Sequence, residues 1–508
     1  MTVFQWACYN RTSMKKLIFA VMLLFMLAQP AQLMNVKAAR EGEPSRVDFS
    51  AEGDGTTVYL PLISNQIQVS NNTSGYRQNA RFLPDPTWLM PSSIFWFGNV
   101  SRSENYVDVR TGFTNTHLVI WIEVFDRMLW YDTSPTDPEL TQYDAISLYL
   151  RPAGVSGSAP DAGTYRFVAQ NYLYYLDQSP YHAEYRGNGS QWVPTDIPYE
   201  LMVGYEGEGG YNQTARDNMG WLMRFEIPYT SLGLTGKPAD GTAWGMAVTL
   251  HDRDDSSGPL PAKSWPPAMA DSRPASWAEL GFGLPAYSPP PAQNVRSITI
   301  RQGLNAASVP DASIGGSTIC GDITKPDFFG QWGTLPESAY ANYTVYNTQV
   351  NIQNQANVAD WPCFAKYYVT FPLGAVPAGK VIQSAKLVMR LFGNSDPTKA
   401  DSSLIHVAMV NADWNEGTLT WNNAPLVAEN FAATYVDPLP GFGGDLGVAS
   451  EWSITAAVLR AYQSGSPLRL VLYSSDWPKH SGKYFYASNY SLPEARPTLV
   501  ITFGDPVQ

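Results

Sequence analysis

Apolar and polar residues alternate along most of this chain, and the alternation predicts β-strands far more often than helices. Thr116 to Asp126 is apolar on both faces, so we expect a central strand that is covered on both sides. Further strands are predicted at Tyr143–Arg151, Thr164–Tyr175, Gly220–Pro228, Trp244–His251 and Val295–Ile300. Gly and Pro separate these runs as turn residues. The pattern therefore predicts an all-β protein with two tandem β-sandwich, jelly-roll-like domains.

A distinctive stretch from His406 to Pro425 reads H-V-A-M-V-N-A-D-W-N-E-G-T-L-T-W-N-N-A-P. It begins as an alternating strand, turns at Gly417 and predicts a short second strand from Thr418 to Trp421. One short helix is expected further on. Its hydroxyl-bearing N-cap is Thr455, and Gly465 ends it.

Changes in this pattern divide the chain into regions. Lys15 and Lys16 precede the apolar run Leu17–Leu27, which predicts an export signal with an N-terminal extension. The run is short for a membrane span, so we expect a secreted or cell-surface protein without a transmembrane segment in the mature chain. The predicted regions are the signal at 1–39, a linker with a short apolar island at 40–71, a β-sandwich at 72–284, a Pro-rich linker at 285–293 and a second β-sandwich at 294–505.

Composition narrows the class of partner. The 508 residues carry a formal net charge of −12, and Lys and Arg are scattered. Nucleic acid is therefore not an expected partner, because phosphate contacts need a basic face. Aromatic residues reach 13% while charged residues stay at 15%, a balance that suits polar surfaces binding neutral ligands. No H-E-x-x-H, G-x-S-x-G or Walker motif occurs, so we do not expect an enzyme.

Two cysteines, Cys320 and Cys363, remain after the predicted export signal. In an exported protein such a pair predicts a disulfide, and two buried thiols are the alternative.

Motif order in the first predicted sandwich suggests a family. T-H-L-V-I-W-I-E-V-F-D is followed by Y-D-A-I-S-L-Y-L, by M-R-F-E-I-P-Y-T-S-L-G-L and by A-V-T-L-H-D-R-D-D. This order resembles carbohydrate-binding module family 9 and the related DOMON-like domains. The resemblance implies a sugar-binding β-sandwich that often carries structural calcium. In the second segment, Ser147 stands where the family usually has Glu.

Three ordered segments of the second predicted sandwich suggest another family. They are K-Y-Y-V-T-F-P-L-G-A-V-P-A-G-K-V-I-Q-S-A-K-L-V-M, then D-W-N-E-G-T-L-T-W-N-N-A-P, then a closing strand at Arg496–Ile501. They resemble the DNRLRE domain, a β-sandwich close to carbohydrate-binding module family 96. The resemblance implies a secreted or surface protein, and some members of that family bind acidic polysaccharides.

An acidic run follows the strand that ends at His251. Asp252, Asp254 and Asp255 offer hard oxygen ligands that suit Ca²⁺, so we predict a structural calcium site there. The distal Glu of an EF-hand loop is missing, and an ordinary acidic turn is the alternative.

Tryptophans outside the predicted strand cores are candidates for sugar stacking, because the C–H faces of sugar rings pack on flat aromatic rings. The candidates are Trp130, Trp192, Trp265, Trp277, Trp414 and Trp477. For each of them, packing into the core is the alternative.

These patterns together predict a secreted or surface protein that binds a polysaccharide or an envelope glycan without catalysis. A structural or adhesive protein that binds other proteins is one alternative. A glycoside hydrolase or polysaccharide lyase with an unrecognised site is the other, since such chemistry needs few residues.

Overall fold

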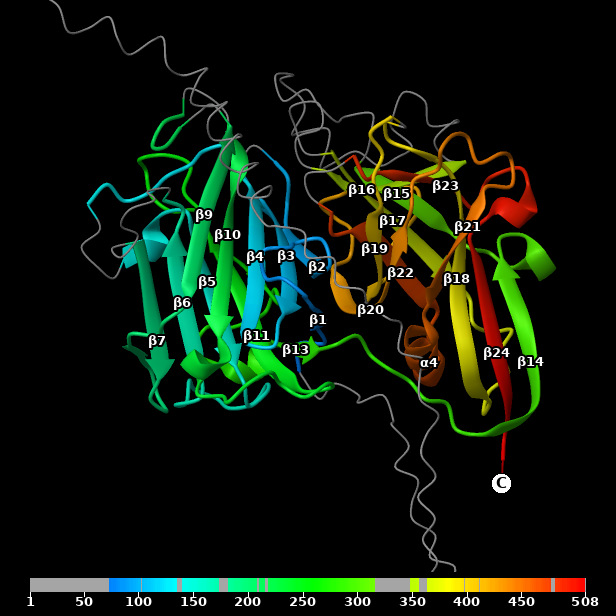
Figure 1. Cartoon of the computed structure of the whole chain (residues 1–508), viewed down its shortest axis with the longest axis horizontal. Helices are drawn as coiled ribbons and strands as arrows, with labels where there is room; N and C mark the ends of the chain where they lie inside the picture. Colours follow the sequence, from blue (N-terminus) through cyan, green and yellow to red (C-terminus); the bar gives the residue numbers. More distant parts are fainter. Residues whose placement is uncertain are drawn as a thin grey trace, which may run out of the picture. The chain divides into compact units, whose positions relative to one another are not determined.

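The computed structural model describes residues 73–101, 103–134, 139–172, 181–207, 210–214, 218–315, 348–355, 363–396, 398–410, 412–476 and 480–507 (Figure 1). These residues belong to one compact unit. The predicted export signal and first linker lie outside the described residues. So do Trp477 and the predicted disulfide, because Cys320 and the side chain of Cys363 are outside them.

Two sheets form the first sandwich, the described residues up to 284. One sheet has the order β2 (Ser93–Gly98), β3 (Tyr106–Phe113), β4 (His117–Phe125), β10 (Asn218–Pro228) and β9 (Glu200–Gly207). The other has the order β1 (Arg77–Phe82), β13 (Ala278–Phe282), β11 (Ala243–His251), β5 (Ala145–Arg151), β6 (Tyr165–Gln170), β7 (His182–Gly187) and β8 (Trp192–Pro194), with β12 (Lys263–Trp265) beside β11. The end of β1 also pairs with β3, so this strand belongs to both sheets.

The second sandwich, the described residues from 292 onwards, also has two sheets. One has the order β20 (Val427–Val436), β19 (Ser403–Val410), β22 (Leu468–Ser474), β17 (Cys363–Phe371) and β15 (Asp311–Gly315). The other has β14 (Ala292–Arg301), β24 (Thr498–Pro506), β18 (Val381–Asn394), β21 (Val448–Ser453) and β23 (Lys483–Tyr486). Strand β16 (Gln349–Gln355) pairs with both β17 and β23 and so links the two sheets.

Helical structure is short. The α-helix α4 spans Thr455–Ser464 and ends at Gly465 in the left-handed conformation, as predicted. The hydroxyl of Thr455 does not cap the helix, because it accepts a hydrogen bond from the backbone N–H of Ala385. The described 3-10 helices are Glu139–Gln142, Tyr229–Leu232, Pro274–Ser276, Leu304–Ala306 and Pro493–Ala495.

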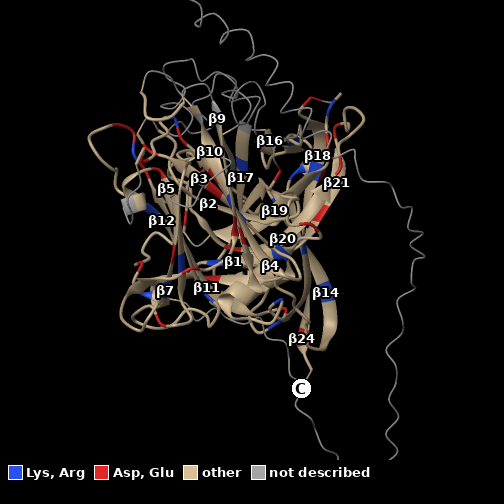
Figure 2. Cartoon of the chain, turned by 60° about the vertical axis from the view of Figure 1, so that its left-hand side comes forward, with Lys and Arg blue, Asp and Glu red and all other residues tan. Residues whose placement is uncertain are grey.

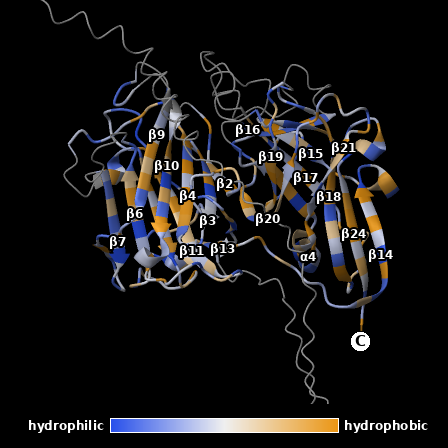
Figure 3. Cartoon of the chain, in the orientation of Figure 1, coloured by the Kyte–Doolittle hydropathy of each residue, from blue (hydrophilic) through white to orange (hydrophobic). Residues whose placement is uncertain are grey.

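The predicted all-β fold is confirmed, and the alternation behind it is visible along β14 and β24 (Figure 3). Strand β4 pairs with β3 on one side and β10 on the other, which confirms the predicted central strand. Strands β5, β6, β11 and β19 also form where the sequence predicted them.

The second strand predicted at Thr418 to Trp421 is wrong. These residues lie in turns, because amide side chains replace strand pairing. The Asn423 side chain accepts a hydrogen bond from Thr420 N and donates one to the carbonyl oxygen of Thr418. The segment therefore satisfies its own backbone groups locally.

One buried apolar cluster contains residues of both sandwiches, including Trp96 and Phe125 from the first and Phe364, Trp421 and Tyr473 from the second. A second cluster fills the interior of the second sandwich around Trp452 and α4. The aromatic layer of the first cluster forms one wall of the pocket described below.

Candidate functional site

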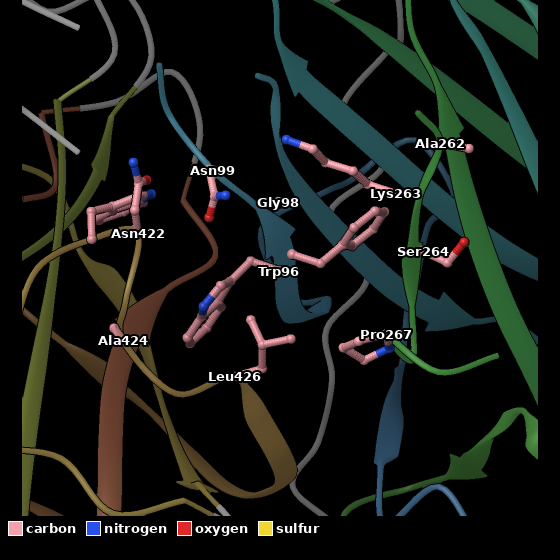
Figure 4. Close-up of a pocket in the computed structure, with 12 residues that line it drawn as sticks. Trp96, Gly98, Asn99, Ala262, Lys263, Ser264, Pro267, Asn422, Ala424 and Leu426 are labelled. Atoms are coloured by element: carbon pink, nitrogen blue, oxygen red, sulfur yellow. The ribbon is translucent and has the colours of Figure 1, made fainter. Parts of the chain in front are cut away.

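A pocket of about 400 Å³ is lined by three segments of the chain (Figure 4). The first segment is the end of β2 with Asn99, the second is β12 with the flanking residues Ala262 and Pro267, and the third is the loop from Trp421 to Leu426 that leads into β20. The first two segments belong to the first sandwich and the third to the second sandwich.

The turn at Gly98 places Asn99 at the pocket. Gly98 has a φ of 82°, in the left-handed region, and a Cβ there would lie 2.3 Å from the carbonyl oxygen of Asn105. Only glycine fits this close approach without strain. The turn leaves the Asn99 side chain beside Glu104, and its Nδ2 donates a hydrogen bond to Oε1 over 3.1 Å.

Asn422 fixes the third segment to the first. Its Oδ1 accepts a hydrogen bond from Val100 N over 2.8 Å, and its Nδ2 donates one to Val100 O over 2.9 Å. This side chain therefore imitates a strand partner for Val100. Both sides of the pocket keep a fixed spacing as a result.

An ion pair stands at the rim. Lys263 Nζ lies 2.9 Å from Glu104 Oε1, and both side chains are partly exposed to solvent. The hydrogen bond from Lys263 lowers the pKa of Glu104, so Glu104 is ionised at neutral pH. The two opposite charges leave this rim without net charge.

Two tryptophans form the buried wall of the pocket, and the ammonium group of Lys366 lies between them. Lys366 Nζ is 3.8 Å from the ring centroid of Trp96 and 3.7 Å from that of Trp421. It also donates a hydrogen bond to Tyr106 Oη over 2.7 Å. Desolvation by burial lowers the pKa of Lys366 well below its usual value, while Asp108 opposes this shift. A desolvated cation between ring faces is held by electrostatic attraction to both rings.

A second candidate site is a buried group of three carboxylates. Asp126 follows β4, Asp144 precedes β5 and Asp252 follows β11, so three strand ends bring them together. One oxygen from each lies within 4.8 Å of the others, and all three side chains are buried. Carboxylate oxygens in such a group are the ligands that Ca²⁺ takes.

Backbone and indole N–H groups orient two of these carboxylates. Asp126 accepts from Met128 N and from Trp221 Nε1, both over 2.9 Å. Asp144 accepts from Trp130 N over 2.6 Å and from Arg253 N over 2.9 Å. Oδ1 of Asp252, in contrast, is buried without a hydrogen-bond partner among the described residues.

The electrostatics of this carboxylate group are unfavourable without a cation. Desolvation, followed by repulsion from neighbouring carboxylates, raises the pKa of Asp126 and Asp144 well above the usual value. The same two causes raise the pKa of Asp252 to about 7. A bound divalent cation would remove both penalties.

The structure changes the predicted ligand set of the metal site. Asp252 is kept, but the other two predicted ligands are not part of the group. Asp254 is half-buried, and exposed Asp255 accepts hydrogen bonds from Ser257 as an ordinary turn residue. Reasoning from the sequence missed Asp126 and Asp144 because they are distant along the chain, although each stands at the end of a predicted strand.

The predicted stacking tryptophans fall into two groups. Trp265 and Trp277 have no solvent-exposed surface, so the prediction that they face solvent is wrong. Trp265 packs on Phe95, and Trp277 Nε1 donates a hydrogen bond to Ala270 O, which explains their burial.

The remaining described candidates, Trp130, Trp192 and Trp414, are half-buried, and their role in binding stays a prediction. Trp88, which the sequence analysis did not single out, is 49% exposed. Trp96 of the pocket was missed as a site residue because it sits in the apolar run Ser93–Gly98, and Trp421 was predicted only as the end of a short strand.

Ser147, the position where the family 9 pattern has Glu, faces other polar groups. Its Oγ lies 3.0 Å from His251 Nε2 and accepts a hydrogen bond from Arg166 over 3.3 Å. Burial lowers the pKa of His251 to about 4, so this histidine is neutral at physiological pH. No carboxylate of the family pattern stands at this position.

Comparisons with known proteins locate a family in the second half of the chain. Residues 333–503 match the family model of carbohydrate-binding module family 96, which confirms the resemblance expected there. A search of curated proteins finds no match.

Two solved structures of a family 9 module from Caldicellulosiruptor kristjanssonii, one in complex with cellotriose and one with glucose, each share 12% identity with this chain. They cover 41% of this chain and 93% and 95% of their own, with TM-scores of 0.29 and 0.28. At these TM-scores the two matches carry no argument about function.

Charged residues of both signs occur along the strands. Figure 2 shows Lys and Arg interspersed with Asp and Glu over the strands in that view. Within the described part of the chain, no helix is long and apolar enough to cross a membrane. The family match supports carbohydrate binding without catalysis.

Proposed function

We propose that this protein is a secreted or surface-attached carbohydrate-binding protein that attaches to a polysaccharide or envelope glycan without cleaving it. The observation that carries the proposal is the match of residues 333–503 to carbohydrate-binding module family 96. The β-sandwich architecture agrees with it, because rigid sheets present binding residues on their loops and edges.

Binding is favoured over hydrolysis by the chemistry of the pocket. Glycoside hydrolysis uses two carboxyl groups that flank the bond, about 5 to 9.5 Å apart. The described residues that line the pocket include no carboxylate, and nearby Glu104 is paired with Lys263. Amide and ammonium groups remain, and these bind sugar hydroxyls without attacking the glycosidic bond.

A structural Ca²⁺ at Asp126, Asp144 and Asp252 is part of the proposal. The support is the buried oxygen of Asp252 without a partner, together with three carboxylates that converge. A cation there would tie the ends of β4, β5 and β11 together and would stabilise the loops around them. The cation would stabilise the fold, and it would not contact a sugar in the pocket, because other residues line that pocket.

The test is affinity electrophoresis of the whole chain in gels that contain single polysaccharides, with and without EDTA. Retardation by at least one polysaccharide, and no release of reducing ends from it, is the expected result. Retardation by none contradicts the proposal and favours a protein-binding surface protein. Release of reducing ends favours the hydrolase or lyase.

A further inference from the structure

We infer that the pocket around Asn99, Lys263 and Asn422 is a saccharide site built by both sandwiches, and that it takes an uncharged sugar residue. This inference rests on the proposed function and specifies where the glycan binds and of which class it is. The two family resemblances concern one sandwich each, whereas this pocket needs both.

The composite nature of the pocket follows from its contacts. Asn99 and Lys263 come from the first sandwich, while Asn422 and Leu426 come from the second. The paired hydrogen bonds between Asn422 and Val100 connect the two sides directly. Neither sandwich alone would present both sides of this pocket.

The size and lining fit a sugar. Ligand sites in proteins typically enclose about 300 to 1,000 Å³, and this pocket has about 400 Å³. Lys263 supplies an ammonium group, and Asn99 adds an amide oxygen. Pro267 and Leu426 supply apolar surface on which the C–H face of a sugar ring can pack (Figure 4).

The charges around the pocket select against an acidic sugar. Lys263 is the cation in the lining, and Glu104 neutralises it over 2.9 Å. A uronate would have to displace Glu104 or lie beside it, and like charges at close range repel. An uncharged sugar meets neither obstacle.

Lys366 is a positioning residue for this site. It does not line the pocket, yet its ammonium group holds Trp96 and Trp421, one from each sandwich, against each other. These rings fix the wall on which the lining side chains stand. The positions of the lining side chains thus depend on the buried ammonium group of Lys366 behind this wall.

Ala262 and Ala268 provide a matched pair of variants for the test. Both are exposed and lie in the same stretch of chain, but only Ala262 lines the pocket. A tryptophan at position 262 would fill the pocket without disturbing the core. A tryptophan at position 268 adds the same bulk outside it.

The experiment measures binding of neutral hexasaccharides (cello-, manno- and xylo-oligosaccharides) and of oligogalacturonate to the full chain by titration calorimetry. We expect Ala262→Trp to weaken binding of the preferred neutral oligosaccharide at least tenfold, and Ala268→Trp to leave it within twofold. Equal binding by Ala262→Trp and the unmodified chain would overturn the inference while leaving the proposed function intact.

A charge variant tests the ligand class. Glu104→Gln leaves Lys263 without its carboxylate, so oligogalacturonate should gain affinity relative to the neutral oligosaccharide by tenfold or more. An unmodified chain that prefers oligogalacturonate overturns the inferred class. An unmodified chain that binds no saccharide at all overturns both the inference and the proposed function.

Discussion

Asn79 and Asn430 bind each other through three hydrogen bonds although 351 positions separate them. Asn79 N donates to Asn430 Oδ1 over 2.7 Å, Asn430 Nδ2 donates to Asn79 O over 2.9 Å, and Asn79 Nδ2 donates to Asn430 O over 2.9 Å. Both side chains are fully buried. The pair joins β1 of the first sandwich to β20 of the second where only Arg77 and Glu429 pair as strand residues.

Removing one side of this pair should destabilise the whole fold. Asn430→Ala leaves the N–H and carbonyl groups of Asn79 buried without partners, at about 1 to 3 kcal/mol each, so we expect a loss of about 2 to 6 kcal/mol. Urea denaturation monitored by tryptophan fluorescence measures it. The exposed Asn489→Ala is the control and should stay within about 0.5 kcal/mol. A loss as small as that of the control would contradict the role of the pair.

The carboxylate group predicts an unusual dependence of stability on pH. The folded-state pKa of Asp252 is raised to about 7, so its contribution is most favourable below the ordinary value near 4 and is lost as pH rises through about 7. In EDTA, the melting temperature should therefore fall between about pH 5 and about pH 8. Ca²⁺ should reverse the fall, adding about 2.7 kcal/mol at one hundred times its dissociation constant. Equal stabilisation by Ca²⁺ at both pH values would count against a site made of these carboxylates.

Single substitutions should distinguish the two acidic ligand sets. Asp252→Asn removes a charge from the buried group, so we expect the calcium-dependent rise in melting temperature to disappear. Asp255→Asn changes only an exposed turn and should leave that rise unchanged. Differential scanning fluorimetry with and without Ca²⁺ measures both. If Asp255→Asn abolished the rise and Asp252→Asn left it unchanged, the ligand set predicted from the sequence would be correct.

Trp277 should matter for stability and not for binding. Its buried ring lies 5.4 Å from that of Tyr149, and truncation of a buried tryptophan costs about 3 to 5 kcal/mol. We expect Trp277→Ala to lose that much in urea denaturation, whereas the exposed Trp88→Ala stays within about 0.5 kcal/mol. Under conditions in which it stays folded, Trp277→Ala should be retarded by polysaccharide gels as much as the unmodified chain. Weaker retardation would indicate that Trp277 contacts the sugar.

The strands were predictable because their signal is local. In β4 the apolar residues on both faces predicted a strand covered on both sides, and β4 and β10 then pair along their length from Trp221 with Val124 to Pro228 with His117. Turn chemistry was less visible. The Asn423 side chain occupies hydrogen-bonding groups that a second strand at 418–421 would have used.

The sites could not be predicted in the same way, since tertiary structure assembles them from distant segments. Asp126, Asp144 and Asp252 each follow or precede a different strand, and no spacing rule connects them. Trp96 and Trp421 are 325 positions apart, and both are buried. Only the burial of Lys366 between them shows that they share a wall. A tryptophan outside the predicted strands can equally be a core residue, as Trp265 of β12 is.

Lys366 and Asp108 should show coupled energetics. Tyr106 Oη lies between them, because it accepts a hydrogen bond from Lys366 Nζ and donates one to Asp108 Oδ1 over 2.5 Å. Losing a charge-assisted hydrogen bond so that a buried partner is left unsatisfied costs about 1 to 3 kcal/mol. Lys366→Met removes the ammonium group and with it the hydrogen bond to Tyr106 Oη, so we expect a loss in that range.

The double variant Lys366→Met with Asp108→Asn then removes both charges. Its loss in urea denaturation should be smaller than the sum of the single losses by more than about 1 kcal/mol, which is the sign of direct coupling. Losses that add within about 0.5 kcal/mol would show that the two groups act independently. In that case the aromatic rings alone hold Lys366, and the walls of the pocket would not depend on Asp108.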